Sequence, residues 1–158
     1  LGPLRLGGWW GNGPGTRFRM QLEPDFLPVP SADAWQTSNP PILAMAPLRT
    51  SLAIFDEAGG IAALRAKSEL LTGYFQFLLD QIPSDLFTVI TPRPPNERGC
   101  QLSILVHDRP AELFKRLEAA GVKADFREPN VIRAAPTPLY NTFHEVWRCA
   151  QILAEHRG

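Results

Sequence analysis

One arginine stands in an apolar segment, where its side chain could hold a carboxylate. Arg133 follows Val131 and Ile132 in the run NVIRAAPTPLYNTFHEVW, which spans residues 130–147. A guanidinium group carries a planar fork of N–H donors and can bind a carboxylate through two parallel hydrogen bonds. Alternatively, the residue lies on an edge strand and places its charged head in water, as long charged side chains usually do. The segment by itself leaves both interpretations open.

Two adjacent tryptophans near the start of the chain could line a ligand site. Trp9 and Trp10 lie among glycines in GGWWGNGPG, and Trp35 follows in the same proline-rich region. Glycine lets a ligand approach the main chain closely, and an indole N–H is a hydrogen-bond donor. The same rings could instead fill a core or a partner interface. A flexible tether would not hold three tryptophans, so we expect residues 1–41 to pack on other structure.

The other chemically active side chains lack the spacing of a known site. The histidines and cysteines form no CxxC or Cys/His pattern, so we predict no metal site and no redox role. These residues are His107, His144, His156, Cys100 and Cys149. The glycine-rich stretches AGG and GNGPG lack the lysine of a phosphate-binding loop.

The composition is that of an ordinary globular domain without a charge bias. The chain has 158 residues, of which 44% are hydrophobic and 20% are charged, and 16 basic side chains balance 16 acidic ones. Because no net positive field attracts phosphate groups, we expect neither nucleic acid nor anionic lipid as a partner. No apolar run approaches the roughly 18 residues of a membrane span, and the chain starts without a signal-peptide pattern, so we expect a cytoplasmic protein.

Two helices should occupy the middle of the chain. The double proline at residues 40–41 bars helix at Asn39, and a helix is expected over residues 44–57, ended by the glycines at 59–60. A longer helix is expected over residues 61–81, because apolar residues recur there at helical spacing. These residues are Ile61, Leu64, Leu71, Phe75 and Leu78.

Strands and two further helices should complete a layered domain. β-Branched and alternating segments predict strands over residues 86–91 and 100–106, joined antiparallel, with short strands at 122–126 and 131–134. A helix between the two strand pairs should start at Asp108, before a proline, and stop at a glycine in left-handed conformation.

The last helix should begin at Thr142, whose spacing to Glu145 is that of a capping box. It should bury Phe143, Val146, Trp147, Ala150 and Leu153. The expected fold class is α+β, a mostly antiparallel sheet covered by helices.

Five segments of the chain resemble one family of enzymes. GWWGNGPGTRFRM, SNPPIL, KSELLTGYFQFLL, ERGCQLSI and IRAAPTPLYNTFHEV occur in the order and at the intervals found in the kynureninase family, whose members use pyridoxal 5'-phosphate. The resemblance covers essentially the whole chain, and five separate segments make it specific. It implies the small C-terminal domain of a fold-type I pyridoxal-phosphate-dependent transferase. Residues 1–41 would then form the end of the large cofactor domain and active-site loops, and residues 42–158 would form the small C-terminal α/β domain.

The resemblance also implies a reaction. Kynureninases hydrolyse L-kynurenine, or 3-hydroxykynurenine, to an anthranilate and L-alanine, in tryptophan catabolism and NAD biosynthesis. The cofactor acts as an electron sink. In this family the active site lies at the interface of a homodimer.

Individual residues match the family's binding sites. Trp9 of GWW and Asn39 of SNPP match residues that touch the cofactor phosphate from the neighbouring subunit. Trp10 matches an aromatic residue that lines the pocket for the substrate's aryl ring. Arg133 of IRAAP matches the arginine that binds the substrate α-carboxylate, which favours the carboxylate interpretation. Asn12 stands where relatives often have histidine.

The resemblance implies that the cofactor-binding lysine and the aspartate that partners the pyridine nitrogen lie upstream of Leu1. We therefore expect a C-terminal part of the enzyme, with no catalytic residue of its own and inactive without the missing N-terminal part. One alternative is another fold-type I enzyme, such as a desulfurase or an aminotransferase. A second alternative is a non-catalytic α+β interaction or ligand-binding module, in which residues 1–41 fold against the chain's own core. On the kynureninase interpretation those residues should instead expose apolar surface.

Overall fold

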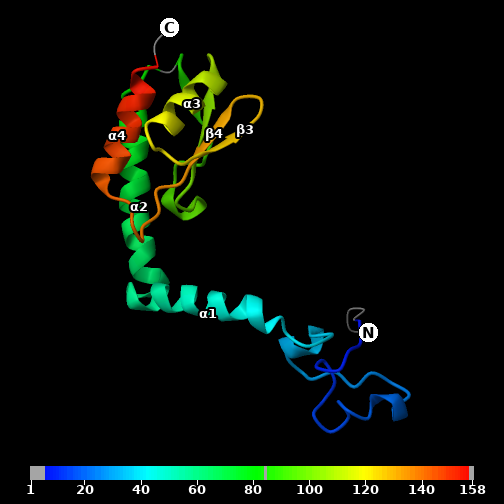
Figure 1. The fold of residues 1–158 in the computed structure, drawn as a ribbon. Helices are drawn as coiled ribbons and strands as arrows, with labels where there is room; N and C mark the ends of the chain where they lie inside the picture. Colours follow the sequence, from blue (N-terminus) through cyan, green and yellow to red (C-terminus); the bar gives the residue numbers. More distant parts are fainter. Residues whose placement is uncertain (1–5, 84, 157–158) are drawn as a thin grey trace. The chain divides into compact units, whose positions relative to one another are not determined.

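A computed structural model describes residues 6–83 and 85–156 of the chain (Figure 1). The chain divides into two compact units, Leu1–Leu52 and Ala53–Gly158. The predicted domain boundary, between residues 41 and 42, lies at the start of the first long helix, Ile42–Glu57. The division between the two compact units lies later, between Leu52 and Ala53 of the same helix. The outer ends of the predicted domains, residues 1–5 and 157–158, lie outside the described residues.

The first unit is rich in loops that approach one another closely. Short 3-10 helices span Met20–Leu22 and Ala32–Trp35. Gly8 passes so near Thr37 that a Cβ at Gly8 would lie 2.1 Å from the Thr37 carbonyl oxygen. Only glycine fits at this crossing, because any side chain would collide with main-chain atoms. The glycines around the tryptophans therefore serve the packing of the loop on itself.

Two helices follow, α1 over Ile42–Glu57 and α2 over Gly60–Leu79. Gly59 and Gly60 between them have φ angles of 91° and 77°, a left-handed conformation that costs glycine little. The predicted glycine stop is thus confirmed. None of the described helices is both long and apolar enough to cross a membrane.

The second unit contains a four-stranded sheet. Its strands are β1 (Phe87–Val89), β2 (Leu102–Val106), β3 (Asp125–Arg127) and β4 (Val131–Ala134). All neighbouring strands are antiparallel, in the order β1-β2-β4-β3. β4 therefore lies inside the sheet, and the interpretation of Arg133 as an edge-strand residue is wrong. The strand order was invisible in the sequence because β4 pairs with β2 across the intervening helix.

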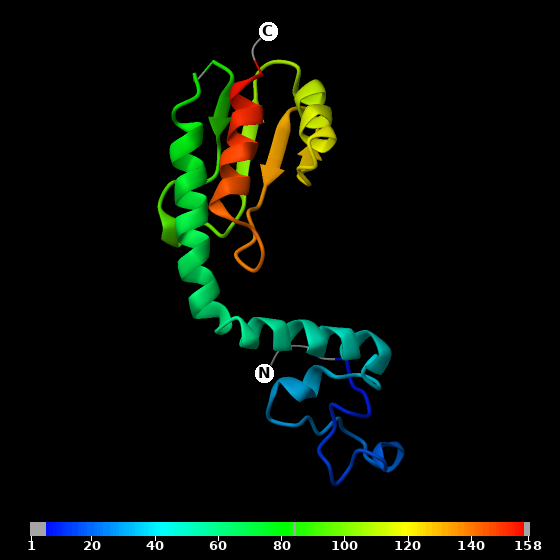
Figure 2. The same ribbon diagram turned by 60° about the vertical axis from the view of Figure 1, so that its left-hand side comes forward.

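Helices α2, α3 (Pro110–Ala119) and α4 (Phe143–Ala154) cover one face of this sheet. Figure 2 shows α4 in front of the strands with α2 beside it. The core lies between the two layers. It contains Leu71, Phe75, Leu102, Ile104, Leu113, Leu117, Ile132, Val146 and Leu153. The α+β prediction, an antiparallel sheet covered by helices, is confirmed.

Some predicted details differ from the structure. Ile61 is exposed, because α2 meets the core only from Leu64 onward. The capping box of α4 is present, but Phe143 and Trp147 are exposed, against prediction. Phe143 lies in the first turn and packs edge-on against Tyr74 with ring centroids 5.7 Å apart. Trp147 lies off the buried stripe of the helix.

The start of α3 also differs. The N-cap is Arg109, with a positive φ of 41°, and not Asp108. The Asp108 carboxylate pairs with Arg109 Nε at 2.9 Å instead of capping the helix. The predicted left-handed stop at Gly121 is confirmed by its φ of 83°.

Candidate functional site

Arg133 lies in the middle of the sheet, on the face opposite the helices. Ile132 and Ala134 on either side of it point into the core, so the alternation along β4 directs Arg133 to the other face. There it stands between Ser103 of β2 and Asp125 of β3, its partners in the strand register. The Arg133 side chain is 33% exposed. A solute can therefore reach the guanidinium group.

Asp125 holds this arginine by one edge. Arg133 Nε donates a hydrogen bond to Asp125 Oδ2 at 2.6 Å, and Nη2 is ion-paired with the same oxygen. Nε and Nη2 form the side edge of the guanidinium plane, so the end edge, formed by Nη1 and Nη2, is left to other ligands. Within the described part of the chain, Asp125 is the only carboxylate paired with Arg133.

The cluster around Asp125 carries a surplus positive charge. Arg127 Nε also donates to Asp125 Oδ2, at 2.8 Å, so two guanidinium groups share one carboxylate. The hydrogen bond from Arg133, with that from Arg127, holds the pKa of Asp125 below its usual range. Asp125 is therefore ionised at neutral pH. A second carboxylate would complete the charge balance of the cluster.

Two predicted site residues of the first unit contact each other. Trp10 Nε1 donates a hydrogen bond to Asn39 Oδ1 at 2.6 Å. Because an indole N–H can only donate, it fixes the amide with its oxygen toward Trp10 and its two N–H donors directed elsewhere. Such donors suit phosphate oxygens. The hydrogen bond thus joins Trp10, which is predicted to line the pocket for the substrate's aryl ring, to Asn39, which is predicted to bind the cofactor phosphate.

Arg17 adds a positive charge beside this pair, which the sequence did not indicate. Its guanidinium carbon lies 4.8 Å from the centroid of the Trp10 ring, and its Nη2 donates to the Trp10 carbonyl at 3.4 Å. Arg17 Nε is buried and has no hydrogen-bond partner among the described residues. A buried donor without an acceptor is costly, and an anionic oxygen placed there would satisfy it. The surroundings of Trp10 therefore fit a phosphate group.

Trp9 points into a different environment. Its ring packs edge-on against Phe18 with centroids 6.3 Å apart, and the residue is 52% exposed. Asn12 is buried and donates from Nδ2 to the Gly8 carbonyl at 2.8 Å. Asn12 therefore supports the loop that carries both tryptophans. The phosphate role of Trp9 stays a prediction.

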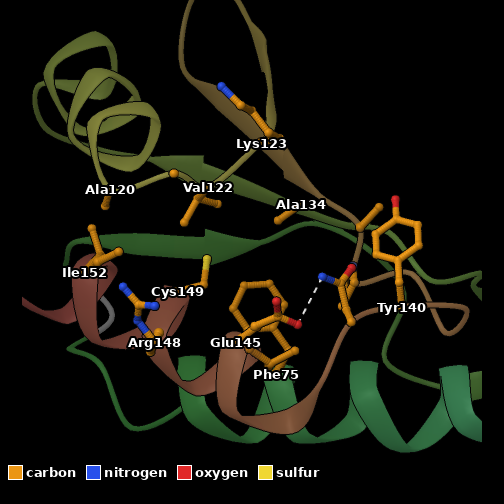
Figure 3. A pocket seen from close by; sticks show the side chains of 15 residues that line it. Phe75, Ala120, Val122, Lys123, Ala134, Tyr140, Glu145, Arg148, Cys149 and Ile152 are labelled. Atoms are coloured by element: carbon orange, nitrogen blue, oxygen red, sulfur yellow. Dashed lines mark hydrogen bonds between the residues drawn. The ribbon is translucent and has the colours of Figure 1, made fainter.

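The second unit also contains a half-open pocket of about 460 Å³ between α4, the end of β4 and the turn after α3 (Figure 3). Its lining includes Phe75, Val122, Ala134, Tyr140, Glu145 and Cys149. In Figure 3 a hydrogen bond joins Asn141 Nδ2 to Glu145 Oε2, at 3.4 Å. Arg133 does not line this pocket, since it projects from the opposite face of the sheet.

The Cys149 thiol that lines this pocket is a poor nucleophile at neutral pH. Burial raises the pKa of the Cys149 thiol to about 11, so the thiolate is scarce at neutral pH. Cys100 is half-buried. Within the described residues, no cluster of three or more His, Cys, Asp or Glu side chains could hold a metal ion.

Asp125 is the partner of Arg133 that sequence reasoning missed, although the sequence contains a signal for it. In the segment DFREPNVIR, Asp125 and Arg133 are equally distant from Pro129. A hairpin that turns at Pro129 must place these two side chains opposite each other, because antiparallel register is symmetric about the turn. The observed register pairs them in this way.

Comparison with known proteins shows which family the chain resembles. Residues 64–153 match the model of the kynureninase C-terminal domain. The chain is 52% identical to the kynureninase of Myxococcus xanthus (strain DK1622), over 96% of this chain and 35% of that protein. It is 54% identical to the kynureninase of Xanthomonas euvesicatoria pv. vesicatoria (strain 85-10), over 90% of this chain and 34% of that protein. The chain thus spans about a third of the length of these curated relatives.

A solved structure shares the fold. The chain resembles a C-DES mutant that has glycine covalently linked to its PLP cofactor, with a TM-score of 0.70. The similarity covers 98% of this chain and 38% of that one, at 16% sequence identity. The TM-score shows that the two chains share a fold although their sequences differ widely, and this confirms the fold-type I prediction. The family match covers most of the second unit, including β4 and its arginine, and the chain belongs to the kynureninase C-terminal domain family.

Proposed function

We propose that the protein that carries this chain is a kynureninase, which hydrolyses L-kynurenine or 3-hydroxykynurenine to the corresponding anthranilate and L-alanine. Family membership supports the reaction class. The single structural observation that carries the proposal is the position of Arg133. Its guanidinium lies on the accessible face of the sheet, held by one edge and with the end edge available to a substrate carboxylate.

Arg133 would bind the α-carboxylate of the amino-acid substrate. Two parallel hydrogen bonds from a planar fork fix both the position and the orientation of the carboxylate. A substrate held in this way keeps the bond to be broken aligned with the reacting centre, which lowers the entropic part of the barrier. The surplus positive charge that Arg127 adds attracts the anionic end of the substrate.

The residues around Trp10 would hold pyridoxal 5'-phosphate through its phosphate group. Asn39 would donate from its amide nitrogen, and the buried Arg17 Nε would gain the acceptor that it lacks. Trp9 is proposed as a further donor, and Trp10 as a wall for the substrate's aryl ring. When bound, the cofactor supplies an electron sink for cleavage of the substrate's side chain. The lysine that binds the cofactor would come from the rest of the protein.

We also propose that the working enzyme is a cytoplasmic homodimer with its active site at the subunit interface. Apolar side chains of the first unit support a partner surface there. Trp9 and Trp35 are 52% and 55% exposed, far more than aromatic residues that fill a core of their own. A self-contained binding module fits less well, because the large hydrophobic cluster of the described residues lies within the second unit, between Leu71 and Leu153.

The test is turnover by the complete protein that carries this chain. The purified protein is saturated with pyridoxal 5'-phosphate and given L-kynurenine, and anthranilate and L-alanine are quantified separately. Equal amounts of the two products support the proposal. If neither product forms while the protein transaminates or desulfurates other amino acids, it is a different fold-type I enzyme. The same assay with 3-hydroxykynurenine establishes which substrate is preferred.

A further inference from the structure

The contact between Arg133 and Asp125 is asymmetric, and the asymmetry has a chemical consequence. A guanidinium group has five N–H donors. The single oxygen Asp125 Oδ2 engages the side edge, Nε and Nη2, and leaves both donors of the end edge in place. The end edge is the one that accepts a second carboxylate in a bidentate geometry without displacing the first.

We propose that Asp125 is a positioning residue for substrate recognition: it anchors the side edge of Arg133 so that the end edge is presented to the substrate α-carboxylate. This inference rests on the proposed function of Arg133. Asp125 would touch neither substrate nor cofactor, and would act only through the arginine.

The strand register makes this anchoring stable. Asp125 and Arg133 are direct partners across the β3–β4 pair, so their Cβ atoms are held close together by the main chain. An arginine side chain has many rotamers, and an accessible arginine without an anchor would sample several of them. With Asp125 in place the guanidinium is preorganised, and less entropy is lost when a carboxylate binds.

The same contact admits one competing interpretation. Asp125 could act as an internal competitor that occupies Arg133 until the substrate displaces it. The positions of the donors favour anchoring, because Nε is engaged and a substrate bound at Nη1 and Nη2 would leave this bond intact. Arg127 also binds Asp125 Oδ2 and would keep that carboxylate in place while the substrate binds.

The two interpretations predict opposite effects of removing the carboxylate. In the complete protein, the inhibition constant of L-alanine against L-kynurenine is measured for the wild type and for the Asp125→Ala variant. L-Alaninamide, which lacks the carboxylate, is the matched probe. Anchoring predicts that Asp125→Ala raises the inhibition constant of L-alanine by about tenfold to a hundredfold, as loss of orientation does, and leaves that of L-alaninamide unchanged. Equilibrium dialysis of radiolabelled L-alanine gives the same comparison without turnover.

Three further variants complete the design. Asp125→Asn keeps an acceptor oxygen of the same shape and should retain part of the affinity, which also provides a variant that folds if the alanine variant does not. Asp108→Asn removes the charge of a more exposed aspartate that is paired with Arg109 outside the proposed site, and it should change neither inhibition constant. In an Arg133→Ala background, Asp125→Ala should have no additional effect, since a positioning residue acts only through its partner.

Each other result overturns the inference. If Asp125→Ala leaves L-alanine binding unchanged while Arg133→Ala weakens it, Arg133 binds the carboxylate without an anchor, and only this inference fails. If Asp125→Ala tightens L-alanine binding, Asp125 is a competitor. If Arg133→Ala itself has no effect on L-alanine, the proposed carboxylate role of Arg133 fails, and the inference fails with it.

Discussion

Replacing Arg133 by alanine should weaken recognition of the substrate by a calculable amount. Removal of one partner of a charge-assisted pair costs about 2–5 kcal/mol. The Arg133 side chain is 33% exposed, so water screens the pair and the lower part of this range applies, about 2–3 kcal/mol. Since 1.36 kcal/mol corresponds to a factor of ten, kcat/KM for L-kynurenine should fall roughly 30-fold to 150-fold.

The assay is steady-state hydrolysis of L-kynurenine by the complete protein, with the wild type and variant at equal cofactor occupancy. Arg133→Lys keeps the charge but loses the planar fork of donors, so its kcat/KM should lie between the values for the wild type and for Arg133→Ala. Arg93→Ala is the control, because Arg93 is ion-paired with an aspartate, Asp80, that has no part in the proposed site. A kcat/KM for Arg133→Ala that equals the wild-type value would refute the reasoning and return the arginine to a structural ion pair.

Further expected results concern the stability and reactivity of the second unit. Thr142→Ala removes the oxygen that accepts from the Glu145 main-chain N–H at 3.2 Å, and should lower the free energy of unfolding by about 1 kcal/mol in urea titrations. The hydrogen bond from the Thr142 main-chain N–H lowers the pKa of Glu145 below its usual value of 4.5. The ionised Glu145 carboxylate therefore stabilises the folded protein above about pH 4.5, and this stabilisation is lost as the pH falls through the folded-state pKa. Glu145→Gln should therefore flatten the acid side of the stability curve; an unaltered curve would contradict this. Cys149, with a pKa of about 11, should resist iodoacetamide at pH 8 in the folded protein and react only on unfolding, as mass spectrometry can follow. Ile132→Ala, at a fully buried position, should lower the free energy of unfolding by about 2–5 kcal/mol. A change in melting temperature as small as that of a surface variant would argue against the core described above.

Local patterns in the sequence were sufficient to predict most helices and strands of the second unit. The alternation around residues 102–106 predicts a strand because period two is the geometry of a half-buried strand, and β2 lies there. The spacing of Thr142 and Glu145 predicts the start of α4, because a capping box depends on residues three apart. The glycines at 59–60 predict the end of α1 through backbone conformation alone.

The errors arose where the outcome depends on distant parts of the chain. Ile61 continues the apolar stripe of α2 but is exposed, because the buried residues of this helix begin only at Leu64. Asp108 has the chemistry of an N-cap, yet it pairs with Arg109 instead, whose left-handed conformation begins α3. Periodicity gives the direction of a side chain along its element, whereas the neighbour that it meets depends on packing.

The family, the fold class and the arginine proposed to bind the substrate could all be predicted from residue types and their order. Other features are visible only in the folded chain: β4 lies inside the sheet, Arg133 faces away from the helices, and Trp10 is hydrogen-bonded to Asn39 and stacked against Arg17. Strand order and side-chain contacts arise from long-range packing, which no local pattern encodes. The pairing of Asp125 with Arg133 lies between the two cases, since hairpin symmetry suggests it and the strand register decides it.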